Sequence, residues 1–94
     1  MFKMKLGTVV KFNNDNGYWV VIESAWKSCK GISKTKVFRK INLNPNWAEE
    51  DKVFTKKRAE FAEIVSTAEL PEDIYNKYAE WKKMKFIVVK EEVY

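Results

Sequence analysis

The sequence contains no histidine, one cysteine, three glycines and two prolines in 94 residues. Without histidine, no side chain of ordinary pKa titrates near neutral pH, and no imidazole is present to activate the thiol of Cys29. One cysteine cannot form an internal disulfide or, without histidine, complete a zinc cluster. Three glycines are also too few for a glycine-rich phosphate loop. We therefore predict no catalytic residues, no metal site and no cofactor.

The sequence also lacks a long apolar run. No segment approaches the roughly 18 apolar residues that span a bilayer. The N-terminus alternates lysines with apolar residues and has no apolar core of the signal-peptide kind. These features predict a soluble, cytoplasmic protein with no membrane partner, and the length of the chain predicts a single domain over residues 1–94.

Charge and aromatic side chains are plentiful and unevenly placed. Residues 1–44 hold nine Lys or Arg and two acids, a net charge of +7, whereas residues 45–94 hold nine against eleven, a net charge of −2. Aromatic residues make up 15% of the chain. A cationic half favours an anionic partner, most often nucleic acid, although basic surfaces also meet acidic proteins.

The first 26 residues predict a β-hairpin. Residues 5–12 and 18–26 are rich in β-branched and aromatic side chains, which favour a pleated, half-buried surface. Asn16 and Gly17 lie between them and tolerate the positive φ of a tight turn. Tyr18 and Trp19 point to opposite faces of the second strand, so one is expected in the core and the other at the surface.

Residues 7–22 resemble the opening of a cold-shock domain, a five-stranded barrel of the OB type. The best matches are Val10-Lys11-Phe12-Asn13 and Gly17-Tyr18. Lys11 stands where the family has a stacking Trp, and the family's later Phe-Val-His-Phe run is absent. The resemblance implies binding to single-stranded nucleic acid, with Phe12 and Tyr18 stacking on unpaired bases.

A third strand is predicted over residues 35–43, after a cationic loop in which Gly31 marks a turn. Alternation places one set of its side chains, Val37, Arg39, Ile41 and Leu43, on one face. The other set, Lys36, Phe38 and Lys40, lies on the opposite and more exposed face.

Two helices and a last strand are predicted downstream. Asn46 is expected to cap a helix whose apolar positions recur at helical spacing, namely Trp47, Phe54, Phe61, Ile64, Val65 and Ala68. Pro71 is expected to begin a second helix with the apolar stripe Ile74, Tyr78 and Trp81. Residues 85–90 then form an apolar run of strand length that suggests burial on both faces.

These elements predict an α+β fold in the order βββααβ, a small twisted sheet or partly open OB-like barrel covered by two helices.

The strongest functional candidate is the basic stretch from Trp26 to Lys40. It contains six cations and no acid, and aromatic rings flank it. Phosphates need such cations and bases need such rings. The predicted nucleic-acid-binding residues are Lys11, Phe12, Tyr18, Lys27, Lys30, Lys34, Lys36, Phe38, Arg39 and Lys40. The alternative is that the lysines protect a solvated edge strand from aggregation.

Three functions remain open at this point. The first is a non-enzymatic protein that binds DNA or RNA, preferably single-stranded. The second is an inhibitor or adaptor of the kind a bacteriophage makes to target a host protein, with exposed aromatics as its hot spot. The third is a subunit that forms a homodimer by adding its C-terminal strand, residues 86–89, to another copy.

Overall fold

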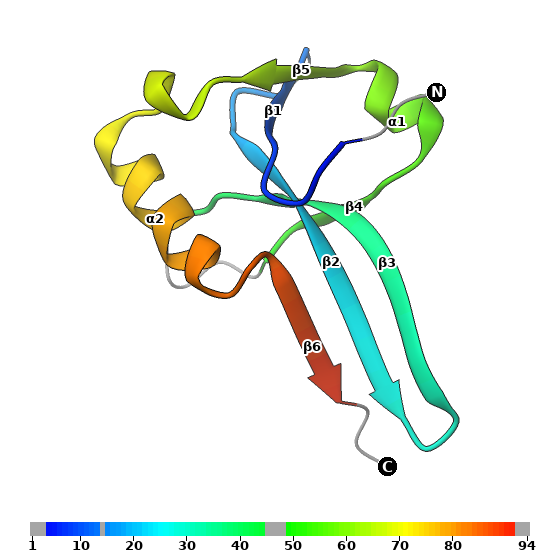
Figure 1. Cartoon of the computed structure of the whole chain (residues 1–94). Coiled ribbons are helices and arrows are strands. Elements are labelled where there is room, and N and C mark those ends of the chain that lie inside the picture. The colour runs from blue at the N-terminus through cyan, green and yellow to red at the C-terminus, as the bar shows by residue number, and fades with distance from the viewer. Residues whose placement is uncertain (1–3, 14, 45–48, 92–94) are drawn as a thin grey trace.

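The computed structural model, shown as a ribbon in Figure 1, describes residues 4–13, 15–44 and 49–91. In chain order its elements are β1 (Val9–Phe12), β2 (Trp19–Ser28), β3 (Gly31–Lys40), β4 (Asp51–Val53), α1 (Lys56–Glu60), β5 (Ala62–Val65), the 3-10 helix η1 (Thr67–Glu69), α2 (Glu72–Lys83) and β6 (Ile87–Glu91). The α+β class predicted from the sequence is confirmed.

The sheet is open and has the strand order β4-β3-β2-β1-β5, with every pair along this path antiparallel. β6 lies outside the path and pairs in parallel with β2. β2 is long enough for two partners on one edge, because β1 pairs with Trp19 and Val20 while β6 pairs with residues 23–27. The C-terminal half of β2 therefore lies between β3 and β6, and no longer beside β1 (Figure 1).

The two predicted turns are present, but one closes differently from the expectation. Between β1 and β2, the carboxylate of Asp15 accepts a hydrogen bond of 2.8 Å from the amide of Gly17. Gly17 does not adopt a positive φ, because this turn is longer than a two-residue hairpin loop and a side chain closes it. Between β2 and β3, Gly31 has a φ of +124° and ends the turn, as expected.

Hydrophobic residues gather in two clusters on opposite faces of the sheet. The α1-side cluster consists of Met4, Val10, Phe12, Trp19, Val21, Phe38 and Ala59. The α2-side cluster consists of Val20, Ile22, Val37, Ile41, Trp81 and Phe86. Neighbouring residues of β2 alternate between the clusters because successive side chains of a strand point to opposite faces. Burying each large side chain contributes about 1.5–3 kcal/mol, so both clusters hold β2 in place.

The single long helix predicted after Asn46 is wrong. Within the described residues this region forms β4, α1, β5 and η1, and only Lys56–Glu60 is α-helical. Phe61 and Ile64, which helical spacing placed in the core, are 51% and 64% exposed. β4 pairs with β3 and β5 pairs with β1, so the segment completes both edges of the sheet. The predicted cap Asn46 and Trp47 lie outside the described residues.

The C-terminal half of the prediction fares better. α2 begins after Pro71, and its stripe Ile74, Tyr78 and Trp81 packs on the α2-side cluster. The last strand is present as β6, but its predicted burial on both faces is wrong, because Ile87 and Val89 are 40% and 61% exposed. No helix in the described ranges is long and apolar enough to cross a membrane.

Candidate nucleic-acid interface

The structure buries the two phenylalanines of the predicted stacking face. Phe12 is 2% exposed and Phe38 is fully buried, and their rings contact each other edge to face at a centroid distance of 5.1 Å. Phe38 was expected on the exposed face of its strand, but here it packs among the side chains of the α1-side cluster and against Phe54. The expected exposure of Phe38 is therefore wrong, and in this structure neither ring is open to a base.

Lys11 and Tyr18 lie on the other side of the sheet from Phe12 and Phe38. Tyr18 packs against the α2-side cluster, and the Lys11 ammonium lies 5.3 Å from the centroid of the Tyr18 ring. Tyr18 is half-buried and Trp19 is fully buried, which decides which of these neighbours belongs to the core. The predicted face that carried Lys11, Phe12, Tyr18, Lys36, Phe38 and Lys40 is therefore not one surface.

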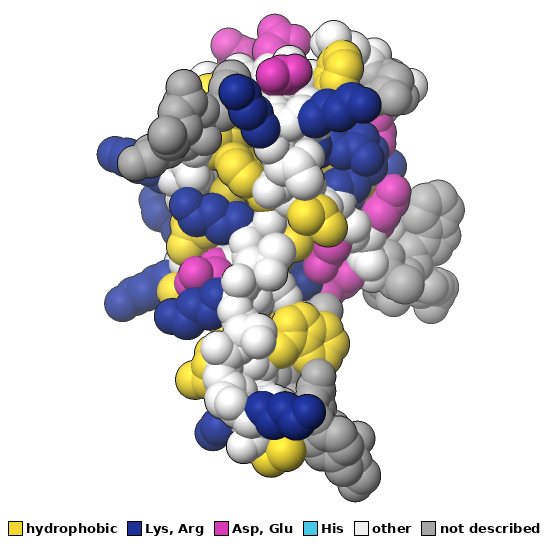
Figure 2. Space-filling model, turned by 90° about the vertical axis from the view of Figure 1, so that its right-hand side faces the viewer, with side chains coloured by type: hydrophobic (Ala, Val, Ile, Leu, Met, Phe, Trp, Pro, Cys, Tyr) yellow, Lys and Arg dark blue, Asp and Glu magenta, His cyan; other side chains and the backbone are white. Residues whose placement is uncertain are grey.

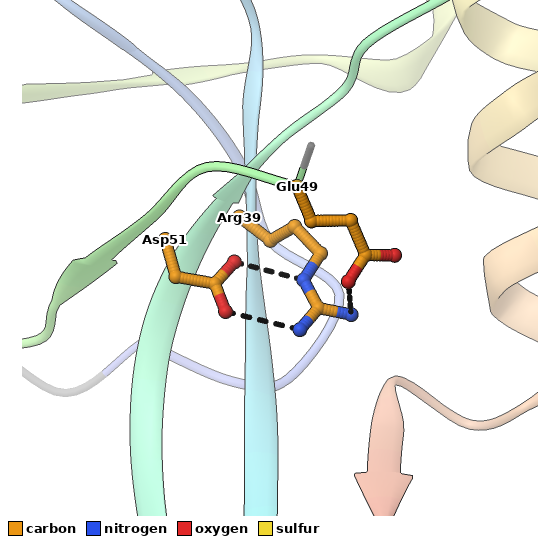
Figure 3. Close-up of polar contacts among 3 residues, drawn as sticks. All are labelled: Arg39, Glu49 and Asp51. Carbon is orange, nitrogen blue, oxygen red and sulfur yellow. Dashed lines mark hydrogen bonds and ion pairs between the residues drawn. The ribbon is translucent and has the colours of Figure 1, made fainter. Parts of the chain in front are cut away.

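Arg39 is part of an internal ion-pair group. Its side chain is 3% exposed, and its guanidinium donates two hydrogen bonds to the carboxylate of Asp51, at 2.8 and 3.0 Å (Figure 3). Its third nitrogen lies 3.2 Å from the carboxylate of Glu49. Burial opposes the charge, but the hydrogen bonds and negative charges of Asp51 and Glu49 outweigh it and raise the pKa of Arg39. Arg39 thus holds β3 to β4 and to Glu49 before it, and its guanidinium is already engaged within the protein.

Lys40 is also engaged within the protein. Its ammonium lies 3.5 Å from the carboxylate of Asp15, which also lies 3.8 Å from the ammonium of Lys52. Both ammonium groups sit over the Trp19 ring, at 5.7 and 4.5 Å from its centroid. The indole nitrogen of Trp19 is buried and has no hydrogen-bond partner in the described structure. Lys40 is therefore a weaker candidate for ligand binding than the lysines further along β3.

The remaining four predicted lysines lie on a projection that we call the arm, formed by residues 23–36 of the β2–β3 hairpin together with β6 (Figure 1). They are Lys27, Lys30, Lys34 and Lys36. All four are exposed, and none forms an ion pair with a residue whose side chain the structure describes. Residues 24–36 contain no acid. In Figure 2, which views the side of β3 and β4, the narrow lower end shows Lys and hydrophobic side chains and no acidic one.

The strand registers place the side chains of the arm in three columns on one face. The β3 column is Lys36, Lys34 and Ile32, the β2 column is Glu23, Ala25 and Lys27, and the β6 column contains Ile87 and Val89. Ala25, in the middle column, has a small side chain that is 4% exposed, and longer side chains lie on both sides of it. The face is therefore cationic along the β3 edge and apolar along the β6 edge.

The opposite face of the arm differs in chemistry. It carries Trp26, which is 42% exposed, between Ser33 and the β6 strand. The sequence identified Trp26 as a ring that flanks the basic stretch, but strand alternation places it on the other side of the sheet from Lys27, Lys34 and Lys36. These lysines and the Trp26 ring are close in sequence, but they lie on opposite faces of the sheet.

Sequence reasoning missed a second cationic group beside α1. A surface hollow of about 290 Å³ is lined by Thr55, Lys57, Arg58 and Phe61 among the described residues. Thr55 is occupied as the N-cap of α1, where its hydroxyl accepts a hydrogen bond from the amide of Arg58. The sequence analysis missed this group because it predicted one long helix here and placed Phe61 in the core.

Comparison with known proteins gives no match. No family model, no curated protein and no solved structure is significantly similar to the chain. The described residues also contain no group of three or more His, Cys, Asp or Glu side chains that could hold a metal ion.

Proposed function

We propose that this protein is a small non-enzymatic nucleic-acid-binding protein whose arm contacts the phosphate backbone. The observation that carries the proposal is the set of four exposed arm lysines, which form no ion pair with any side chain that the structure describes. Cations already paired inside a protein gain little from a phosphate, whereas solvated lysines release the counterions of the nucleic acid when they bind. Arg39 and Lys40 are engaged internally, so the arm carries the function.

The width of the arm favours single-stranded DNA or RNA over a duplex groove. β6, β2 and β3 span about 10 Å between their outer strand axes before side chains are added. The major groove of B-DNA is about 12 Å wide and admits a helix or a two-stranded ribbon. A single strand has no such limit and can follow the lysines of the β3 edge. Trp26 supplies a ring of the kind on which bases stack.

The OB-like character of the fold belongs to the same proposal. Its support is the antiparallel path β1–β2–β3 with a later strand, β5, added to β1. The arm, however, replaces the stacking face that the cold-shock resemblance implies. The proposal also includes a cytoplasmic location, where the exposed thiol of Cys29 stays reduced.

The test is fluorescence anisotropy of labelled single-stranded and duplex DNA and RNA at several salt concentrations. We expect binding that weakens with salt, with a slope of about 0.7 for each phosphate neutralised on a single strand. The triple variant Lys27→Gln, Lys34→Gln and Lys36→Gln should lower that slope by about 2 and weaken binding to all sequences alike.

The matched control is the triple variant Lys82→Gln, Lys83→Gln and Lys85→Gln, which removes three exposed charges at the end of α2. It changes the net charge equally and leaves the arm intact. Equal loss of affinity in both triple variants would show that only total charge matters. Affinity that does not depend on salt, or no binding at low salt, would overturn the proposal.

The second candidate function is binding to a host protein as an inhibitor or adaptor. The apolar β6 edge of the arm favours it, because Ile87 and Val89 lie exposed beside cations on one face. Aliphatic side chains add nothing to a phosphate contact but suit an acidic protein surface with apolar residues. Capture from a nuclease-treated lysate separates the candidates, since a partner held through nucleic acid is lost on digestion.

A further inference from the structure

The outer edge of β6 offers backbone groups for strand pairing. β6 pairs with β2, and with no other strand among the described residues. The carbonyl of Phe86 accepts a hydrogen bond of 2.8 Å from the amide of Glu23. In a parallel ladder alternate residues bond to the neighbouring strand, so the peptide groups of Ile87 and Val89 are directed away from β2. The Ile87 amide is used in a turn to Met84, at 3.3 Å, which leaves the Val89 amide and both carbonyls facing outward.

The side chains along this edge are apolar and exposed. Ile87 is 40% and Val89 61% exposed, and both lie on the lysine-bearing face of the arm. Val88, between them, points to the other face and packs against the α2-side cluster. An exposed edge strand with apolar side chains is a template for pairing with another strand.

We infer that β6 pairs antiparallel with β6 of a second copy, about a two-fold axis that passes midway between the Val88 residues of the two copies. An axis perpendicular to the sheet places residues of the same face opposite one another. In this register Ile87 lies opposite Val89 of the other copy, and Val89 opposite its Ile87. The outward Val89 amide of each copy then meets the outward Ile87 carbonyl of the other. In this register apolar side chains face apolar side chains and outward amides meet outward carbonyls, so a second copy supplies the groups that this edge requires.

The charge of the arm does not prevent this pairing. Pairing at β6 gives the continuous order β3-β2-β6-β6-β2-β3, so the two β3 columns of lysines lie five strand spacings, about 24 Å, apart. The Debye length is about 8–10 Å at physiological ionic strength, so repulsion between these columns is largely screened. Added salt should favour the dimer further, whereas it weakens nucleic-acid binding. The inference does not depend on the proposed function.

The experiment is sedimentation equilibrium of the full chain, without nucleic acid, at low and high protein concentration. We expect the mass to rise from one chain to two as concentration increases, and to rise more readily at higher salt. Val89→Asp places a charge in the apolar contact and should keep the protein monomeric. Val89→Pro removes the outward amide, which the β2–β6 ladder does not use, and should act in the same direction.

The control is Val53→Asp, which changes a valine of 60% exposure on β4, at the far edge of the sheet. It should dimerise like the unchanged protein. A mass of one chain at every concentration would overturn the inference and leave the β6 edge to a different protein or to solvent. A dimer that survives both Val89 variants, or that Val53→Asp abolishes equally, would also overturn it. Oligonucleotide binding by a protein that stays a monomer at every concentration would support the proposed function and reject this inference alone.

Discussion

Phe38 connects most of the aromatic core on the α1 side of the sheet. Its ring lies 5.1 Å from the ring of Phe12 and 4.9 Å from that of Phe54. Phe12 in turn meets Trp19 at 5.7 Å. The two pairs that Phe12 forms are edge to face and the Phe38–Phe54 pair is tilted, and aromatic pairs add about 0.5–1.5 kcal/mol each to the effect of burial. Phe38 is therefore a stability residue, although it stands between two of the lysines predicted to bind nucleic acid.

Replacing Phe38 by alanine should lower the free energy of unfolding by about 3–5 kcal/mol, because it opens a cavity in a close-packed cluster. Phe61→Ala, at a ring 51% exposed, is the matched control and should cost less than about 1 kcal/mol. Urea denaturation of the two variants measures both. A Phe38→Ala protein as stable as Phe61→Ala would contradict the burial described here.

For the cations of β3, the sequence does not reveal which side chains form ion pairs inside the protein. Lys34, Lys36 and Arg39 look alike in the basic stretch, and composition predicted the same role for all three. Arg39 is instead 3% exposed because Asp51, twelve residues away, meets it across the β3–β4 pair. Which cations remain available for a ligand depends on long-range pairing, which spacing along the chain does not encode. The sequence placed Arg39 on the less exposed face of its strand but did not predict its pairing with Asp51.

The segment between β3 and α2 shows that spacing along the chain can also fail to predict whole secondary-structure elements. Its apolar residues recur at helical spacing, which favoured one amphipathic helix. The segment instead supplies β4 to the edge of β3 and β5 to the edge of β1. β4 and β5 form hydrogen bonds with the backbone groups along the edges of β3 and β1, which would have no strand partner there if the segment were a helix. The β1–β2 hairpin and α2 were predictable because each depends on neighbours in sequence, whereas β4 and β5 depend on strands far away along the chain.

The junction of β6 with the N-terminal segment depends on Gly7. Gly7 has a φ of +89°, and a Cβ added there would lie 2.6 Å from a carbon of the Phe86 ring. The hydroxyl of Tyr78 in α2 donates a hydrogen bond of 3.1 Å to the Gly7 carbonyl. β6, α2 and the chain before β1 therefore meet at one glycine.

Gly7→Ala and Gly31→Ala form a matched pair that separates packing from backbone strain. Both glycines have a positive φ, but a Cβ at Gly31 would meet no atom within 4 Å. We expect Gly7→Ala to destabilise the protein by about 1–3 kcal/mol more than Gly31→Ala, because the methyl group overpacks the site against Phe86. Thermal or urea unfolding measures the difference. Equal losses would mean that the Phe86 ring moves aside without cost.

In the folded molecule, some cations are paired with acids near the core, whereas others are exposed on the arm. Glu49 and Asp51 pair with Arg39, and Asp15 lies beside Lys40 and Lys52, so acids neutralise the cations near the core. The arm lysines have no such partners among the side chains that the structure describes. Residues 24–36 hold four lysines and no acid, so positive charge gathers on this projection, which suits electrostatic steering of an anionic ligand.

The same arrangement makes the stability of the whole molecule depend on pH through Asp15, which joins the β1–β2 turn to β3 and β4. The hydrogen bond from the Gly17 amide, and the charges of Lys40 and Lys52, hold the pKa of Asp15 below its ordinary value of 3.8, against a smaller opposing effect of burial. A carboxylate with a lowered pKa in the folded state stabilises the protein above its unfolded pKa, and this contribution is lost as pH falls through the folded pKa.

Asp15→Asn keeps an oxygen that can accept from Gly17 but removes the charge beside the two lysines. We expect it to lower the free energy of unfolding by about 1 kcal/mol above about pH 5, and the difference from the unchanged protein to shrink toward zero in stronger acid. Urea denaturation over a series of pH values measures this. Glu60→Gln, at an exposed acid without an ion pair among the described residues, should show no such dependence. A loss in Asp15→Asn that stayed constant with pH would mean that the carboxylate acts only as a hydrogen-bond acceptor.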